Sequence, residues 1–223
     1  MLGEKAPSFV AETTKGKINF PRDYTGQWVI FFSHPADYTP VCTTELVAFQ
    51  SFQKDFSDLN AQLLGLSVDD VELHKSWIKD IADKIQFDGF ENTMINFPII
   101  DDSKKKISKL YGMLQPTTSE SSTVRAVFII DPEGIIRAIL YYPQSTGRNI
   151  KEIKRLLMAL KTTDEFGIVT PANWKPGKDV LVSPIQEMKL DDTENDGQMK
   201  CYDWFLCFKN LPASKIEEKI TYS

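Results

Sequence analysis

Apolar runs of strand length alternate with segments of helical periodicity along the first two thirds of the chain. Short runs rich in Val, Ile, Phe and Leu are typical of buried strands. The predicted strands are residues 28–33, 62–68, 97–100, 124–130 and 135–141. Apolar positions repeating every three or four residues predict the helices between them. These are residues 43–59, 72–82, 104–111 and 149–160.

The last two predicted strands flank the tetrad Asp131-Pro132-Glu133-Gly134, a strong turn signal. They are therefore expected to form a hairpin. Strands that alternate with helices and end in a hairpin and a helix predict an α/β domain with a mixed sheet and flanking helices.

The composition changes after this domain. Residues 162–178 contain two prolines and two glycines and are interpreted as a linker. Beyond it, residues 189–190 and 199–208 flank a turn-forming segment at 195–197, which predicts a small β element. We therefore predict one domain over residues 1–162 and a C-terminal β-containing arm over 163–223. The arm is too short for a large core of its own and should pack on the main domain or on a second subunit.

The net charge and the hydropathy of the chain argue against nucleic acid as the main partner, a membrane span and a signal peptide. The 223 residues carry a formal net charge of −5, which argues against nucleic acid as the main partner. No segment approaches the roughly 20 apolar residues of a membrane span. The N-terminus lacks the apolar stretch of a signal peptide, so a cytoplasmic location is expected.

The cysteines and histidines are few. The chain has three cysteines, Cys42, Cys201 and Cys207, and two histidines, His34 and His74. No spacing among them fits a zinc site, and neither a metal nor a cofactor is expected. If residues 199–208 form one strand, Cys201 and Cys207 stand about 20 Å apart along it. A disulfide requires Cα atoms within about 7 Å, so these two cysteines are not expected to pair.

Cys42 has a distinctive local setting. A strand ends near Ser33 and a helix follows, with Thr39 as a suitable N-cap and Pro40 at the favoured first position. Cys42 then lies in the first helical turn, where unpaired N–H groups and the helix dipole favour a thiolate. A thiolate attacks a peroxide oxygen to give a sulfenic acid. The alternative is that Cys42 is a small buried hydrophobic residue, which is common for cysteine.

The segment around Cys42 resembles a known family. Pro35-x-x-x-Thr39-x-x-Cys42 is similar to the peroxiredoxin active-site signature, and residues 40–45 resemble its one-cysteine, peroxiredoxin 6-like group. The resemblance continues through residues 97–102, 123–128, 142–143, 146–149, 169–171 and 173–175. It implies a thioredoxin-like fold and an antioxidant, thiol-dependent peroxidase acting on hydrogen peroxide and organic hydroperoxides.

The resemblance implies three catalytic residues. Cys42 would be the peroxidatic nucleophile, which passes through a sulfenic acid. Thr39 would donate a hydrogen bond to the peroxide. Arg125 would pair with the thiolate and polarise the O–O bond, since the transition state requires donors near the leaving oxygen.

The resemblance also implies four supporting residues. Pro35 would shield the thiolate from water, and His34 would flank the sulfur as a hydrogen-bond partner. Glu45 and Arg148 would hold Arg125 in place.

One departure concerns regeneration of the cysteine. Two-cysteine relatives carry a resolving cysteine in a Val-Cys-Pro segment, whereas here the matching stretch is Val169-Thr170-Pro171. The resemblance therefore implies an external thiol reductant, of glutathione or thioredoxin type. It also implies a homodimer in which the C-terminal arms are exchanged or embraced.

Alternatives stay open on the sequence alone. In the first alternative, the protein is a redox relay in which the oxidised Cys42 passes its oxidation to a partner protein. In the second, it is a non-catalytic, chaperone-like oligomer with the same fold. In the third alternative, Cys201 or Cys207 resolves the sulfenic acid on Cys42. The set of Thr39, Cys42 and Arg125 favours the peroxidase.

Overall fold

The computed structural model describes residues 1–115, 121–182 and 199–221, which form two compact units, Met1–Ile150 and Lys151–Ser223. The strands of the first unit are β1 (Phe9–Thr13), β2 (Gly16–Phe20), β3 (Trp28–Ser33), β4 (Ala61–Ser67), β5 (Ile99–Asp101), β6 (Arg125–Ile130) and β7 (Ile136–Tyr142). Its helices are η1 (Arg22–Tyr24), α1 (Pro40–Ser51), α2 (Gln53–Asp58), α3 (Val71–Lys84) and α4 (Lys106–Leu110).

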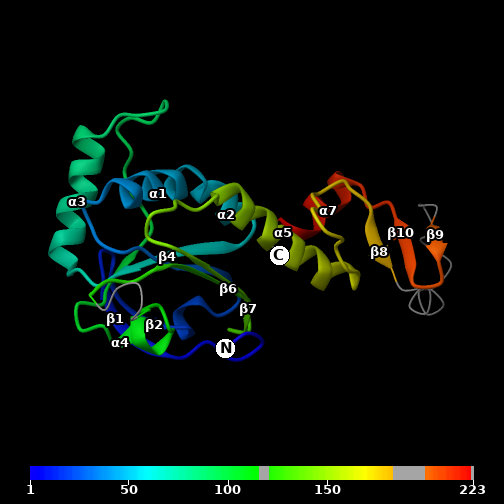
Figure 1. The fold of residues 1–223 in the computed structure, drawn as a ribbon, viewed down its shortest axis with the longest axis horizontal. Helices are drawn as coiled ribbons and strands as arrows, with labels where there is room; N and C mark the ends of the chain where they lie inside the picture. Colours follow the sequence, from blue (N-terminus) through cyan, green and yellow to red (C-terminus); the bar gives the residue numbers. More distant parts are fainter. Residues whose placement is uncertain (116–120, 183–198, 222–223) are drawn as a thin grey trace. The chain divides into compact units, whose positions relative to one another are not determined.

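The described strands of this unit form one seven-stranded sheet in the order β2-β1-β5-β4-β3-β6-β7 (Figure 1). Strands β3, β4 and β5 run parallel, and β6 and β7 form the predicted antiparallel hairpin beside β3. The predicted mixed sheet is therefore confirmed. Because β6 is the direct neighbour of β3, the residues at their adjacent ends are brought close together.

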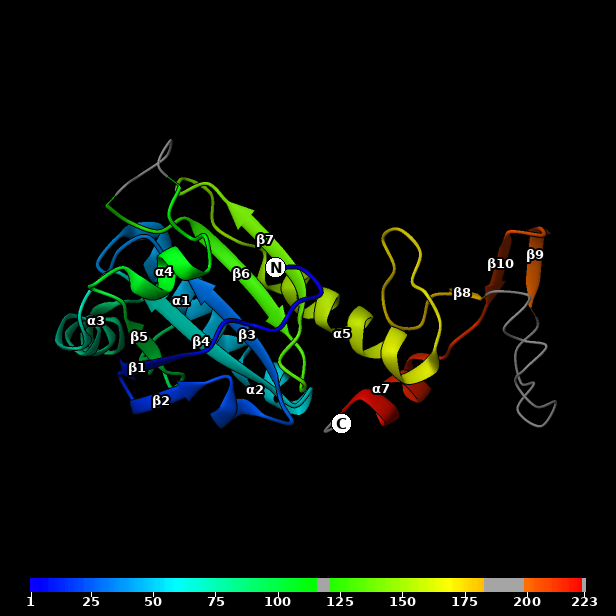
Figure 2. The ribbon, with the colours of Figure 1, turned by 90° about the horizontal axis from the view of Figure 1, so that it is seen from below.

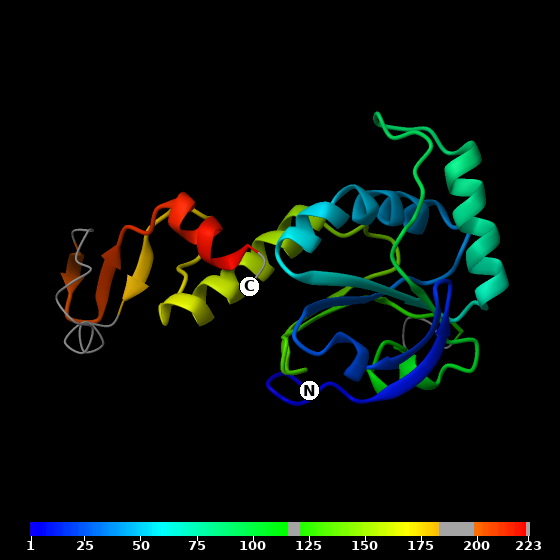
Figure 3. The ribbon, with the colours of Figure 1, turned by 180° about the vertical axis from the view of Figure 1, so that it is seen from behind.

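Helices cover both faces of the sheet. α1 and α2 lie on one face and α4 on the other, as Figures 1, 2 and 3 show from three sides. The side chains of β3 alternate between these layers, as strand geometry requires. Phe32 stacks on Phe49 of α1 with ring centroids 4.0 Å apart, whereas Phe31 meets Tyr111, just after α4, at 5.0 Å. All residues of β3 are buried, which explains its continuous apolar run.

Two elements of this unit differ from the sequence predictions. The predicted helix 43–59 begins earlier, at Pro40, and is broken into α1 and α2 at Phe52, whose φ of −95° and ψ of 2° leave the helical range. The hairpin of β1 and β2 was not predicted. It lies at the edge of the sheet and exposes residues such as Val10, so its apolar pattern is weak.

The second unit contains α5 (Ile150–Phe166), β8 (Val180–Val182), β9 (Lys200–Asp203), β10 (Leu206–Lys209) and α7 (Ala213–Ile220). The three strands form an antiparallel sheet in the order β8-β10-β9, so the arm contains the expected β element. α5 continues through the predicted boundary at 162, and the first residues of the predicted linker are helical. The division into 1–162 and 163–223 stays a prediction. The predicted turn at 195–197 lies outside the described residues.

The pairing of Cys201 and Cys207 corrects the sequence analysis. Residues 199–208 do not form one strand, because the chain reverses between β9 and β10 and Cys201 stands opposite Cys207. Their Cα atoms are 4.0 Å apart, and the two side chains form a disulfide. Cross-strand neighbours in an antiparallel pair lie about 4.5 to 5.5 Å apart, which explains how residues close in sequence can pair.

Across the described ranges, no helix combines the length and the apolar character that crossing a membrane requires.

Candidate active site

Cys42 occupies the first turn of α1. Strand β3 ends at Ser33, a six-residue loop follows, and α1 begins at Pro40 after the extended N-cap residue Thr39. These features of the sequence prediction are confirmed. The Thr39 side chain makes no capping bond, and its hydroxyl donates to the Ala36 carbonyl at 3.0 Å. The Cys42 side chain is fully buried at the third helical position.

Arg125, the first residue of β6, reaches across to α1. Its Nη1 atom lies 3.3 Å from Sγ of Cys42 and 2.7 Å from Oε2 of Glu45. Its Nε and Nη2 atoms both donate to the carbonyl of Gln144, at 2.9 and 2.7 Å. The guanidinium is therefore fixed by hydrogen bonds on both of its edges, and the second N–H of Nη1 faces the sulfur.

Arg148 completes the cluster from the loop before α5. Its backbone N–H and Nε donate to Oε1 of Glu45 at 2.8 and 2.9 Å, and Nη2 donates to Oε2 at 2.7 Å. Its Nη1 atom donates to the carbonyls of Ser33 and Ala126, each at 2.9 Å. Arg148 thus ties the end of β3, the start of β6 and the first turns of α1 together.

The charges of this cluster explain its chemistry. Glu45, Arg125 and Arg148 are all nearly inaccessible to solvent. Burial raises the pKa of Glu45, but the charges and hydrogen bonds of Arg148, and the charge of Arg125, outweigh it and hold the pKa below its ordinary value. One buried carboxylate between two guanidinium groups leaves one positive charge in excess. A thiolate on Cys42 would balance that charge.

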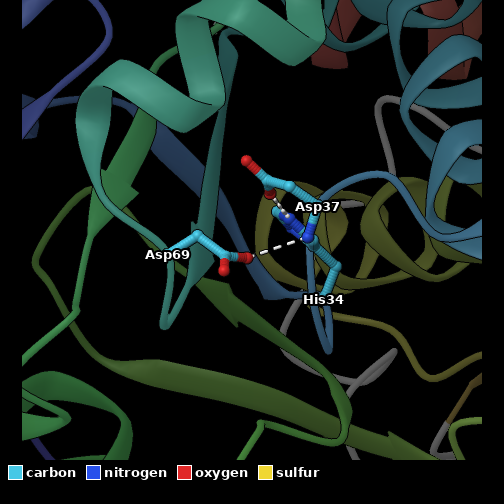
Figure 4. Close-up of side chains that lie close together, drawn as sticks. All are labelled: His34, Asp37 and Asp69. Carbon is cyan, nitrogen blue, oxygen red and sulfur yellow. Dashed lines mark hydrogen bonds and ion pairs between the residues drawn. The ribbon is translucent and has the colours of Figure 1, made fainter.

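A second buried network lies in the loop that precedes α1. Asp37 accepts from Nε2 of His34 at 2.8 Å and from Nδ1 of His74, on α3, at 2.6 Å. The backbone N–H of Asp37 donates to Oδ2 of Asp69 at 2.8 Å (Figure 4). Asp37, His74 and Asp69 were not among the predicted site residues. No pattern links the histidine of α3 to the loop, because only the fold brings these segments together.

Three residues of this network are spaced as metal ligands can be. Ligand atoms of His34, Asp37 and Asp69 lie within 4.8 Å of one another. However, both oxygens of Asp37 accept hydrogen bonds from histidines, and Oδ2 of Asp69 accepts from Asp37 and from Ser67 Oγ at 2.9 Å. Because these atoms already have hydrogen-bond partners, the arrangement fits a hydrogen-bonded network better than a metal site.

Some of the predicted site residues make the predicted contacts in the structure, and His34 does not. Cys42, Arg125, Glu45 and Arg148 form one contiguous cluster, and Pro35 is buried in the loop before α1. The predicted hydrogen bond between His34 and the sulfur is not formed. Nδ1 of His34 is buried and has no hydrogen-bond partner among the described residues, while Nε2 is bonded to Asp37. The ring is turned toward Asp37, whose charge attracts the N–H.

Comparison with known proteins identifies the family. The sequence pattern described as "AhpC/TSA family" matches residues 2–139, more than half of the chain. The chain belongs to the peroxiredoxin family. The pattern of the C-terminal domain of 1-Cys peroxiredoxin matches residues 159–192.

Individual relatives agree with this assignment. A peroxiredoxin of Methanosarcina mazei is 52% identical over 213 residues, which cover 94% of this chain and 97% of the relative. The structure of a yeast mitochondrial 1-Cys peroxiredoxin matches with a TM-score of 0.82 and 40% identity, over 95% of this chain and 99% of that one.

Peroxiredoxin 6 of Arenicola marina, solved as a cysteine-to-serine mutant, matches with a TM-score of 0.83 and 33% identity, over 95% of this chain and 98% of that one. The expected fold and activity are thereby confirmed. This peroxiredoxin has the thioredoxin-like fold and is a thiol-dependent peroxidase of the one-cysteine group, with an antioxidant role.

Proposed function

We propose that Cys42 is the peroxidatic cysteine and that it reduces hydrogen peroxide and organic hydroperoxides. The observation that carries this proposal is the 3.3 Å contact between Nη1 of Arg125 and Sγ of a fully buried cysteine in the first turn of a helix. All three cysteines lie in the described ranges, and Cys42 is the free one among them, since Cys201 and Cys207 are bonded to each other.

In the proposed reaction, the Cys42 thiolate attacks the terminal oxygen of the hydroperoxide. A sulfur–oxygen bond forms as the O–O bond breaks. The leaving oxygen takes up a proton and departs as an alcohol, or as water when the substrate is hydrogen peroxide. The sulfur is oxidised to sulfenic acid and the peroxide is reduced, which is the first step of thiol oxidation.

Arg125 supports this step from a fixed position. Its charge stabilises the thiolate before attack and the developing negative charge on the leaving oxygen during it. Thr39 is proposed to donate to the peroxide, for which its hydroxyl must turn from the Ala36 carbonyl, because a hydroxyl has one proton. Pro35 shields the site from bulk water, and Glu45 and Arg148 hold Arg125 in place.

The proposed reductant of the sulfenic acid is an external thiol. Thr170 stands where two-cysteine relatives carry a resolving cysteine. The structurally similar yeast protein is described as a 1-Cys peroxiredoxin resolved by glutathione and thioredoxin systems. A thiol of one of these two types is therefore proposed for this chain as well.

The proposed assembly is a homodimer in the cytoplasm. The hairpin of β9 and β10 exposes 65% of Tyr202, 81% of Trp204 and 65% of Phe205. Large apolar groups clustered on one exposed element are typical of an interaction surface. This cluster lies in the segment for which the resemblance implies exchange between subunits.

The decisive experiment replaces each cysteine by serine and follows peroxide consumption with a small-thiol reductant. Cys42→Ser should abolish turnover while the circular dichroism spectrum is unchanged. Cys201→Ser and Cys207→Ser are the matched controls and should keep turnover. A Cys42→Ser variant with more than a small fraction of the wild-type rate would refute the assignment.

A second route for the same site would use Cys201 and Cys207, which the structure holds as a disulfide. After an external thiol reductant has cleaved this disulfide, one of the two freed thiolates attacks the sulfenic sulfur of Cys42, which forms a disulfide with Cys42 and releases the sulfenic oxygen as water. Peptide mapping separates the routes when the protein is first reduced with excess thiol, the thiol is removed, and one equivalent of peroxide is then added. A stoichiometric disulfide between Cys42 and Cys201 or Cys207 supports the internal route. Sulfenic acid that persists until thiol is added supports the external one.

A further inference from the structure

His74 is held between two hydrogen-bond acceptors. Its Nδ1 atom lies 2.6 Å from Oδ2 of Asp37, and its Nε2 atom lies 3.1 Å from the carbonyl oxygen of Ile100. A carbonyl and an ionised carboxylate can only accept hydrogen bonds, whereas a neutral imidazole has a single N–H. Both contacts are hydrogen bonds only if both ring nitrogens carry a proton. The geometry therefore describes His74 as a buried imidazolium.

His34 binds the same carboxylate in a different state. Its Nε2 atom lies 2.8 Å from Oδ1 of Asp37, so Nε2 carries a proton. Its Nδ1 atom is buried and has no hydrogen-bond partner among the described residues. A proton at that position would leave a buried charge half satisfied, which is costly. His34 is therefore neutral, with the lone pair on Nδ1.

The charges around the two rings agree with this assignment. Burial lowers the pKa of His34, and the positive charges of His74 and Arg148 add to this effect against the opposing influence of Asp37. Burial also lowers the pKa of His74, but Asp37, the Ile100 carbonyl and Asp69 outweigh it and raise the pKa above its ordinary value. Burial raises the pKa of Asp37, but its hydrogen bonds to His34 and His74 bring it to about 2.

The network is attached to the loop that sets the start of α1. Asp37 lies two residues before Thr39, and its backbone N–H is bonded to Asp69 after β4. The His34 carbonyl accepts from Oγ1 of Thr123 at 2.7 Å. The His34 ring also lies 5.3 Å from the ring of Trp77, which is on α3 like His74. Helix α3 thus holds the loop through contacts with both His34 and Asp37.

We propose that His74 is a positioning residue for the peroxidatic site: as an imidazolium it holds Asp37, and Asp37 holds His34, neutral and protonated at Nε2, in the loop that leads to Thr39 and the first turn of α1. This inference rests on the proposed function of Cys42.

The ring states can be measured directly, because the chain has only two histidines. Nitrogen-15 NMR of the full-length protein labelled at histidine should show one imidazolium and one neutral ring protonated at Nε2 near neutral pH. His74→Gln leaves a single histidine signal and assigns both. Two neutral rings, or a His34 ring protonated at Nδ1, would overturn the proposal.

Variants test whether the ring states affect the reaction. In His74→Gln, a neutral side chain replaces the cation, so His34 should titrate at higher pH than in the wild type. Peroxide reduction should slow by between about 10-fold and 100-fold, the range expected when a supporting residue is misplaced. Lys75→Gln, its exposed neighbour on α3, is the matched control and should change neither the His34 titration nor the rate. A His74→Gln variant with wild-type rate and an unchanged His34 titration contradicts the proposal.

Asp37→Asn provides an independent test if His74→Gln fails to fold. An asparagine amide can donate to Nε2 of His34, which would move the ring proton to Nδ1. The NMR signals should show this reversed tautomer together with a slower reaction. Cys42→Ser separates the two proposals: it should keep both ring states while abolishing turnover. An active Cys42→Ser would refute the proposed function alone, and altered ring states in the wild type would refute only this inference.

Discussion

Arg125 and Cys42 are 83 residues apart in the sequence, yet Nη1 of the arginine lies 3.3 Å from Sγ of the cysteine. The contact joins the start of β6 to the first turn of α1. Because the guanidinium is also held by Glu45 and by the carbonyl of Gln144, its position does not depend on the thiolate. The positive charge is therefore in place before the peroxide binds.

Replacement of Arg125 should weaken the reactivity of Cys42. In Arg125→Ala we expect alkylation of Cys42 to need higher pH, since the stabilising charge is lost, and peroxide reduction to slow by roughly 10²-fold. Arg125→Lys should restore only part of the rate, because lysine lacks the planar fork. The measurements are alkylation rate against pH and stopped-flow peroxide consumption. Arg137→Ala, in β7, is the control and should leave both unchanged; an unaltered alkylation profile in Arg125→Ala would disprove the pairing.

Glu45→Gln should destabilise the fold and remove part of its acid sensitivity. The pKa of Glu45 lies below its ordinary value of 4.5, so the carboxylate stabilises the fold above that pH and loses this effect as the pH falls through the lowered value. Removing one partner of a buried ion pair costs about 3 to 5 kcal/mol. Urea denaturation at neutral and at acidic pH should show a cost that is larger at neutral pH.

The matched control for this variant is Glu152→Gln. Glu152 also pairs with an arginine, Arg155 at 2.7 Å, but its side chain is 41% exposed. An exposed pair contributes between about 0 and 1 kcal/mol, so the control should change the free energy of unfolding much less. Equal costs for the two variants would show that the buried position of Glu45 has no special importance.

The pair of His74 and Asp37 should stabilise the fold in a pH-dependent way. The pKa of His74 is raised above its ordinary value of 6.5, so its contribution is complete below that pH and is lost as the pH rises through the raised value. We therefore expect His74→Gln to be destabilised most near about pH 6 and less near about pH 9. Chemical denaturation of both proteins across this range gives the difference. A destabilisation that is the same at every pH would argue against a charged His74.

The exposed aromatic residues of the β9–β10 hairpin should determine the oligomeric state. Each large aromatic group at the centre of an interface contributes about 2 kcal/mol or more, so Trp204→Ser with Phe205→Ser should shift a dimer to monomer. Light scattering at micromolar concentration measures the mass. Leu2→Ser, which replaces a residue 66% exposed in the first unit, is the control and should keep the wild-type mass. A wild-type protein of monomer mass would refute the proposed homodimer.

The sequence by itself determined the local framework of the site. The buried run before Ser33, the N-cap position of Thr39 and the proline that follows it fix the strand, the loop and the start of α1. These signals act between residues a few positions apart, so they can be recognised without the fold. The turn at 131–134 likewise determined the hairpin that carries Arg125, and the motif around Cys42 indicated the family.

The tertiary structure decided which distant groups meet. Glu45 and Arg148 are 103 residues apart, and no local pattern shows that both guanidinium groups share one carboxylate. The contact between His74 on α3 and Asp37 could not be predicted either, because only the packing of α3 brings the two side chains together. Cys201 and Cys207 were misjudged for the same reason: the reversal between β9 and β10 has no glycine or proline to mark it, and it is the pairing of β10 with β8 and β9 that places the two sulfurs together.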